Sequence, residues 1–190
     1  DLLDSALRAL RIAPDVSLSI MTKGQSPNDV LARVVQRLPP ALAELSPYAV
    51  LVQGDTTSVL GAAIAAFHLG IRVGHVEAGL RTYDRSNPFP EEANRDLVDR
   101  LSTWCFAPTA EASANLRREG IGRERILVTG NTGVDALLWT LSQYELNVWT
   151  DDLVLITLHR RESFSSHLED ILNGIVDFLK ETPEARAVWP

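Results

Sequence analysis

The stretch AVLVQGDTTSVLGAAIAAFHLGIRVGHVE, residues 49–77, decides the fold class. Residues 49–55 form a short apolar run that ends in polar residues, as is typical of a strand buried on both faces. Residues 56–70 predict a helix of small residues that ends at Gly70. Residues 71–77 predict the next strand. A strand, a helix and a second strand in this order predict a right-handed βαβ unit with parallel strands.

The alternation of strand and helix continues along the chain. Amphipathic helices are predicted at residues 1–12 and 28–45, and Pro39–Pro40 should end or kink the second of them. Further helices are predicted at 91–102, 110–120, 132–142 and 166–180, and further strands at 103–109, 125–131, 153–159 and 185–189. The pattern therefore predicts an α/β fold with a parallel sheet.

The segment YELNVWTDD, residues 144–152, is the best candidate for a domain boundary. It predicts an N-terminal Rossmann-like domain over residues 1–143 and the beginning of a second domain over residues 153–190. The second part has about 40 residues, which is near the lower limit for a domain that folds alone. The sequence begins at Asp1 without a methionine, so we expect it to be part of a longer protein.

The composition argues against several classes of protein. The chain has 190 residues, of which 45% are hydrophobic and 23% are charged, as in ordinary globular domains. Its formal net charge of −7 argues against a nucleic-acid partner, which needs a basic face. The apolar runs are too short to span a bilayer, so no membrane partner is expected. The single cysteine, Cys105, excludes an internal disulfide and fits a reducing compartment.

Polar residues follow the ends of the predicted strands. Asp55, Glu77, Asn131 and His159 each end or follow a different strand, and Pro108–Thr109 follow another. In a parallel sheet the carboxyl ends of the strands line one edge, and open α/β sheets bind ligands at that edge. We therefore expect residues that are far apart in the sequence to meet at one site.

Each of the charged candidates also has a structural explanation, which the sequence leaves open. Asp55 could cap the helix that follows it, because Asp is favoured at that position. Glu77 could pair with Arg81. Glu91 follows Pro90 and could be a first-turn acid that the helix dipole favours. The basic residues that follow His159 could form an exposed patch.

Motifs of other chemistries are absent from the sequence. It contains neither G-x-G-x-x-G nor G-x-x-x-x-G-K-[ST], so the dinucleotide and P-loop fingerprints fail. It also lacks the G-x-S-x-G nucleophile elbow. His75, Glu77, Asp55 and His159 include no pair at the i, i+4 spacing of a helical metal motif. We therefore expect no metal.

Five segments provide a more specific indication. They are QGDTTS (53–58), GHVEAGLRT (74–82), NPFPEEANR (87–95), TGNTGVDAL (129–137) and LHRRESF (158–164). In order and spacing this set resembles that of bacterial non-hydrolysing UDP-N-acetylglucosamine 2-epimerases. The resemblance implies two Rossmann-like domains of the glycosyltransferase B type, with the active site in the cleft between them. It also implies a cytoplasmic homodimer that interconverts UDP-GlcNAc and UDP-ManNAc without a nicotinamide cofactor.

The resemblance also implies a mechanism. The family expels UDP by anti elimination to give 2-acetamidoglucal, and then adds UDP again with a proton on the opposite face of C2. Proton transfers on two faces need more than one group, and carboxylates also stabilise the cationic character that develops as the C1–O bond breaks. By resemblance Asp55, Glu77 and Glu91 take these roles, and His159 lies near the departing diphosphate. Which carboxylate is the acid and which is the base stays open.

Substrate binding is assigned by the same resemblance. The residues implied are Arg160, Arg161, Asn131 and Arg95, and the two adjacent arginines would add positive charge at the phosphates or between the domains. The family's opening strand and most of its second domain are missing from the sequence. We therefore expect little or no activity from the 190-residue chain alone.

Three alternatives stay open. The first is a hydrolysing epimerase, which releases ManNAc and UDP from the same intermediate. The second is a glycosyltransferase of the same fold, but it would not need acid–base groups for C2, so Glu77 and Glu91 together argue against it. The third is a non-catalytic or dimer-forming fragment that keeps a remnant of the cleft.

Overall fold

A computed structural model describes residues 2–143, 153–158 and 168–189 of the chain. The chain divides into two compact units, residues 1–137 and residues 138–190. The predicted linker at residues 144–152 lies outside the described residues.

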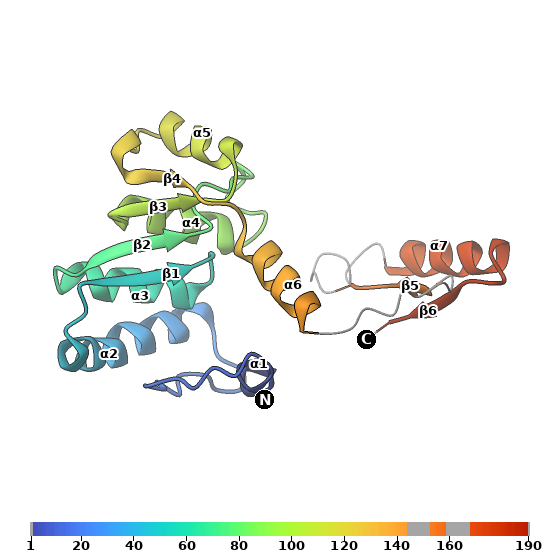
Figure 1. Ribbon diagram of the computed structural model, residues 1–190, viewed down its shortest axis with the longest axis horizontal. Coiled ribbons are helices and arrows are strands. Elements are labelled where there is room, and N and C mark those ends of the chain that lie inside the picture. Colours follow the sequence, from blue (N-terminus) through green and yellow to red (C-terminus); the bar gives the residue numbers. More distant parts are fainter. Residues whose placement is uncertain (1, 144–152, 159–167, 190) are drawn as a thin grey trace. The chain divides into compact units, whose positions relative to one another are not determined.

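The first unit contains a four-stranded parallel sheet in the order β1-β2-β3-β4 (Figure 1). Its strands are β1 (Ala49–Gln53), β2 (Arg72–Val76), β3 (Trp104–Ala107) and β4 (Ile126–Val128). The helices are α1 (Leu2–Ala9), α2 (Pro27–Leu45), α3 (Thr57–His68), α4 (Glu91–Leu101), α5 (Ala110–Arg118) and α6 (Thr132–Ser142), with a short 3₁₀ helix at Arg123–Arg125. The predicted α/β fold with a parallel sheet is confirmed.

The small residues of α3 allow it to pack closely against its neighbours. Ala63 and Ala66 are fully buried in a core cluster that also contains Val73 of β2. A Cβ at Gly61 would lie 2.9 Å from the Cβ of Val34 on α2, so a larger residue would push the two helices apart. The segment that predicts the fold is therefore also the centre of the first core.

Helix α2 shows where local sequence rules were overridden. It begins at a capping box, in which Ser26 and Asp29 each accept the other's backbone N–H. The prediction that Pro39–Pro40 could end the helix is wrong, because α2 continues to Leu45. Val34 before the prolines and Leu42 after them are both buried, and this packing keeps the helix continuous.

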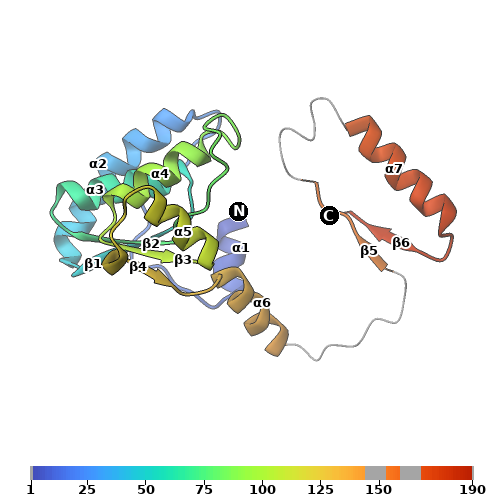
Figure 2. The same cartoon turned by 90° about the horizontal axis from the view of Figure 1, so that it is seen from above.

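The second unit has a smaller described part. Strands β5 (Leu153–Leu155) and β6 (Arg186–Val188) pair in parallel, and α7 (Leu168–Glu181) lies beside them (Figure 2). A strand, helix and strand were predicted at these places in the sequence. Among the helices that the structure describes, none combines the length and the apolar content needed to cross a membrane.

Candidate active site

The ends of β1 and β2 bring two of the predicted acids to one edge of the sheet. Asp55 follows the end of β1 by two residues, and Glu77 follows directly on β2. A Cβ placed on Gly54 would lie 3.6 Å from Oε2 of Glu77, so the carboxylate of Glu77 reaches the turn that carries Asp55. The expected meeting of these two strand ends is therefore present in the structure.

The backbone at Glu77 has an unusual conformation. Its φ angle is 75°, in the left-handed region that side-chain-bearing residues avoid. The N–H groups of Glu77 and Ala78 both donate to the carbonyl of Phe106 on β3, at 3.1 Å each. Strain of this kind persists only where the surroundings hold it, and it is concentrated at functional sites.

Helix α4 joins the edge through its first turns. Arg95 donates from Nη2 to the carboxylate of Asp55 at 2.5 Å, and Asn94 donates from Nδ2 to the backbone carbonyl of Asp55 at 2.9 Å. Glu91 lies three and four residues before them, which places it on the same face of the helix. The structure therefore puts Asp55, Glu77 and the Glu91 face of α4 at the same edge.

The three acids differ in their contacts. The carboxylate of Asp55 is paired with Arg95. Within the described ranges, the carboxylates of Glu77 and Glu91 have neither a hydrogen-bond nor an ion-pair partner, although both residues are half-buried. A half-buried carboxylate without a protein partner can exchange a proton with a bound molecule, whereas a paired one is held as a fixed negative charge.

Two of the structural explanations are wrong. The residue that caps α3 is Thr56, whose hydroxyl accepts from the backbone N–H of Val59 at 3.4 Å, so Asp55 is not the cap. Arg81 does not pair with Glu77 but with acids on α4 and at the end of α5. The third explanation is compatible with the structure, because Glu91 is the first residue of α4.

The other predicted residues lie partly outside the described chain. His159, Arg160 and Arg161 are not among the described residues. Asn131 closes the turn before α6, where its Oδ1 accepts from the N–H of Gly133 at 2.8 Å. The next residue, Thr132, accepts from the side chain of Gln53 at the end of β1, at 2.9 Å. Asn131 is thus near the same edge, in a role that stabilises the turn.

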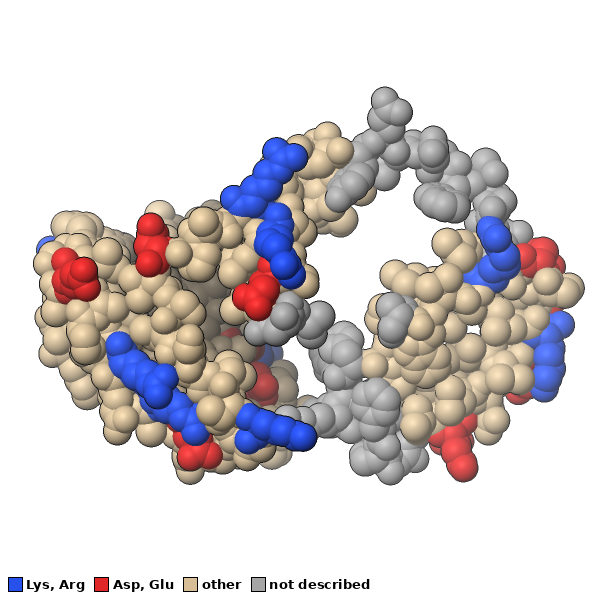
Figure 3. Space-filling view, turned by 90° about the horizontal axis from the view of Figure 1, so that it is seen from below, with Lys and Arg blue, Asp and Glu red and all other residues tan. Residues whose placement is uncertain are grey.

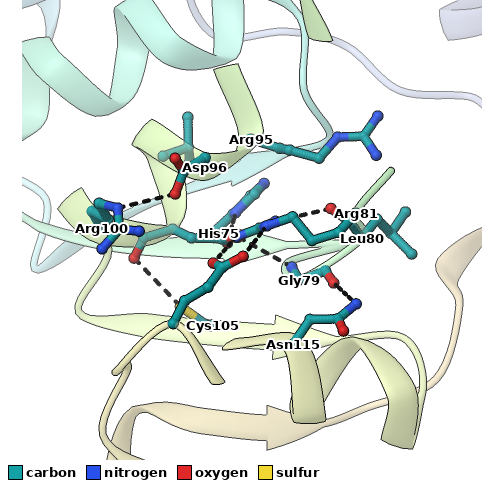
Figure 4. Close-up of polar contacts among 12 residues, drawn as sticks. His75, Gly79, Leu80, Arg81, Arg95, Asp96, Arg100, Cys105 and Asn115 are labelled. Carbon is teal, nitrogen blue, oxygen red and sulfur yellow. Dashed lines mark hydrogen bonds and ion pairs between the residues drawn. The ribbon is translucent and has the colours of Figure 1, made fainter. Parts of the chain in front are cut away.

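Sequence reasoning missed a buried network under this edge, shown in Figure 4. His75 is fully buried, with Nδ1 at 2.6 Å from Oδ1 of Asp99 and Nε2 at 2.8 Å from the carbonyl of Gly54. Asp99, also fully buried, accepts from the N–H of Gly79 at 3.2 Å and from Nη2 of Arg81 at 2.7 Å. An acid on a helix face that also carries the fully buried Val98 was the signal that could have revealed it.

The network continues to α5 and shifts two ionisation equilibria. Arg81 donates two hydrogen bonds to Glu119, at 2.8 Å and 2.6 Å. Burial alone would lower the pKa of Arg81, but these bonds and the charge of Asp99 outweigh it and raise the pKa. Burial raises the pKa of the Cys105 thiol to about 12, and the charge of Asp99 acts in the same direction.

Glu92, next to Glu91, has a different role from its neighbour. It is buried, and its carboxylate accepts from the backbone N–H groups of Thr82 and Tyr83 at 2.9 to 3.1 Å. It also lies 3.5 Å from Nη1 of Arg95. Glu92 therefore anchors the loop that follows β2 and is not available for proton transfer.

A pocket of about 270 Å³ lies near this network but does not contain the predicted acids. Its lining consists of Arg81, Tyr83, Arg85, Glu92, Asp96, Arg100 and Glu119. Figure 3 shows Lys and Arg interspersed with Asp and Glu on one face of the molecule. Over the described part of the chain, no group of three His, Cys, Asp or Glu gathers as a metal site would require.

Comparison with known proteins gives one consistent result. The family model described as UDP-N-acetylglucosamine 2-epimerase matches residues 1–190. The chain is 41% identical over 204 residues to the UDP-N-acetylglucosamine 2-epimerase of Yersinia pestis, which covers 100% of this chain and 54% of the relative. The identity and coverage are the same for the enzyme of Escherichia coli strain K12.

Solved structures agree with this result. The crystal structure of UDP-GlcNAc 2-epimerase from Neisseria meningitidis bound to UDP-GlcNAc matches with a TM-score of 0.92 and 38% identity, over 100% of this chain and 54% of that one. The enzyme of Methanocaldococcus jannaschii in complex with UDP-GlcNAc and UDP matches with a TM-score of 0.82 and 36% identity, over 96% and 52%. The chain thus spans about half the length of the relatives it matches.

Proposed function

The chain belongs to the UDP-N-acetylglucosamine 2-epimerase family, and from this premise we propose that the whole protein interconverts UDP-GlcNAc and UDP-ManNAc. The observation that supports this most directly is the pair Glu77 and Glu91. Both are half-buried carboxylates at one edge of the sheet, without partners in the described chain, beside the paired carboxylate of Asp55. Because the chain spans about half of its relatives, the activity is proposed for the whole protein.

The proposed reaction is anti elimination of UDP to 2-acetamidoglucal, followed by addition of UDP with a proton on the opposite face of C2. Glu77 and Glu91 exchange the protons, because their carboxylates are free of protein partners. Asp55, held by Arg95, supplies a fixed negative charge where cationic character develops at the sugar. His159 acts near the departing diphosphate.

Substrate binding is proposed for the four residues named from the family. Arg160 and Arg161 contact the phosphates, and Asn131 lies at the edge close to the end of β1. Arg95 orients Asp55, and its buried Nε–H has no hydrogen-bond partner in the described chain, so one donor is left for the substrate. No nicotinamide cofactor and no metal take part in this proposal, and the protein is proposed to be a cytoplasmic homodimer.

The experiment is to incubate the whole protein with UDP-GlcNAc in deuterated water. Deuterium at C2 of the recovered UDP-sugars, with UDP-ManNAc formed, is the expected result. Release of free ManNAc would point to the hydrolysing reaction, and absence of C2 exchange would exclude both.

Two substitutions test the roles of the acids. Glu77→Gln and Glu91→Gln should each lower turnover by at least ~10²-fold, the scale of general acid–base catalysis, and leave the fold intact. The matched control is Glu111→Gln, since Glu111 is exposed on α5, and this variant should retain normal turnover. Normal turnover in both test variants would return Glu77 and Glu91 to structural roles.

A further inference from the structure

The loops that carry Asp55 and Glu77 are joined underneath by residues outside the predicted site. Nε2 of His75 bonds to the carbonyl of Gly54, the residue before Asp55. Asp99 accepts from the N–H of Gly79, two residues after Glu77. The bond of 2.6 Å between Nδ1 of His75 and Asp99 completes a continuous link between the two loops.

The hydrogen-bond pattern fixes where the protons of this link lie. A carbonyl oxygen can only accept, so Nε2 of His75 carries the hydrogen of its bond to Gly54. One further proton lies between Nδ1 and the carboxyl of Asp99, whichever of the two groups holds it. In both forms the charges of His75, Asp99, Arg81 and Glu119 sum to zero, so the buried cluster keeps no unpaired charge.

We propose that Asp99 is a positioning residue for the epimerase reaction, through the continuous contacts His75–Gly54 on one side and Gly79 on the other. This inference rests on the proposed function. Glu77 has a backbone conformation that its own chain does not favour, so the surroundings must hold it. Displacement of a catalytic group by about 1 Å can lower a rate by ~10²-fold, so the support of the loops bears directly on turnover.

The substitution Asp99→Asn tests geometry apart from charge. Its amide oxygen can accept from Gly79 and Arg81, and its amide nitrogen can donate to Nδ1 of a neutral His75. The network then keeps its hydrogen bonds and its neutrality, so kcat should stay within about tenfold of the wild type. Asp99→Ala removes the link, and kcat should fall by ~10²-fold while KM changes by less than about fivefold.

Two further variants make the test decisive in the whole protein. Glu119→Gln alters the same network, but Glu119 contacts Arg81 and neither loop, so kcat should be unchanged even if the melting temperature falls. His75→Asn can still reach Asp99 but is too short to reach the carbonyl of Gly54, so kcat should fall as in Asp99→Ala. If Asp99→Ala does not fold, His75→Asn and Asp99→Asn decide the question.

The outcomes separate this inference from the proposed function. Wild-type protein without C2 deuterium incorporation would refute the proposed function itself. If the wild type exchanges deuterium, normal kcat in a folded His75→Asn variant would overturn the positioning role. An equal loss of kcat in Glu119→Gln and Asp99→Ala would also overturn it, because destabilisation of the network alone would then explain the effect.

Discussion

Replacement of Gly79 by alanine should destabilise the first unit much more than the same replacement of Gly120. Both glycines have a positive φ angle, 83° at Gly79 and 85° at Gly120. A side chain in this region costs about 1–2 kcal/mol at either position. The surroundings differ, because a Cβ at Gly120 meets nothing within 4 Å, whereas a Cβ at Gly79 would lie 2.3 Å from the carbonyl oxygen of Ala112 and 2.8 Å from Cγ of Leu116.

The steric difference sets the expected magnitudes. The contact with Ala112 is roughly 1 Å inside van der Waals distance, so α5 must move. Such overpacking adds about 1–3 kcal/mol, which gives a total loss of about 2–5 kcal/mol for Gly79→Ala against about 1–2 kcal/mol for Gly120→Ala. At a slope of about 2 kcal/mol per molar urea, the midpoints should fall by about 1–2.5 M and about 0.5–1 M.

The assay is urea unfolding of the whole protein and its two variants, followed by far-UV circular dichroism. The midpoint should fall more in Gly79→Ala, with little change in slope. Equal shifts in the two variants would refute the reasoning, because they would mean that the close approach of the loop to α5 has no energetic consequence.

Three further predictions concern single contacts. Cys105 should not react with an aromatic disulfide reagent at pH 8 until urea unfolds the protein, because burial raises the pKa of its thiol to about 12 and the thiolate is the reactive form; rapid labelling of the native protein would contradict this. Glu92→Ala leaves the backbone N–H groups of Thr82 and Tyr83 without their acceptor, so it should cost about 1–3 kcal/mol and speed tryptic cleavage at Arg85; an unchanged digestion pattern would argue against the anchor. Thr109→Ala removes the cap of α5 and should lower the unfolding free energy by about 1 kcal/mol, measured by urea titration, and no loss would show that the cap is dispensable.

Most of the fold could be predicted from the sequence because its signals are local. Apolar runs of strand length and helices closed by glycine identify the four βα units of the first sheet without knowledge of their contacts. The prediction failed at Pro39–Pro40, where the local rule for proline competes with the burial of Val34 and Leu42 on both sides. The sequence did not reveal that this burial would prevail.

The site could be predicted where topology alone places a residue. Asp55 and Glu77 follow neighbouring parallel strands, and their approach requires no knowledge of side-chain contacts. Glu91 and Glu92 could not be told apart in this way, because adjacent helix residues point in directions about 100° apart and only packing shows which one is buried. Asp99 has a partner on β2, and such a pairing is not visible in one sequence.

The buried charges also affect how the protein opens in the native state. Their hydrogen bonds join residues that are 18 to 38 positions apart in the chain, so no partner can be replaced by a neighbour in sequence. An opening that detached α4 or α5 alone would leave a buried charge unpaired, which makes local opening costly relative to opening of the whole block. The amide hydrogens of Ala78 and Gly79 should therefore exchange with solvent as slowly as those of the core strands, although they belong to a loop.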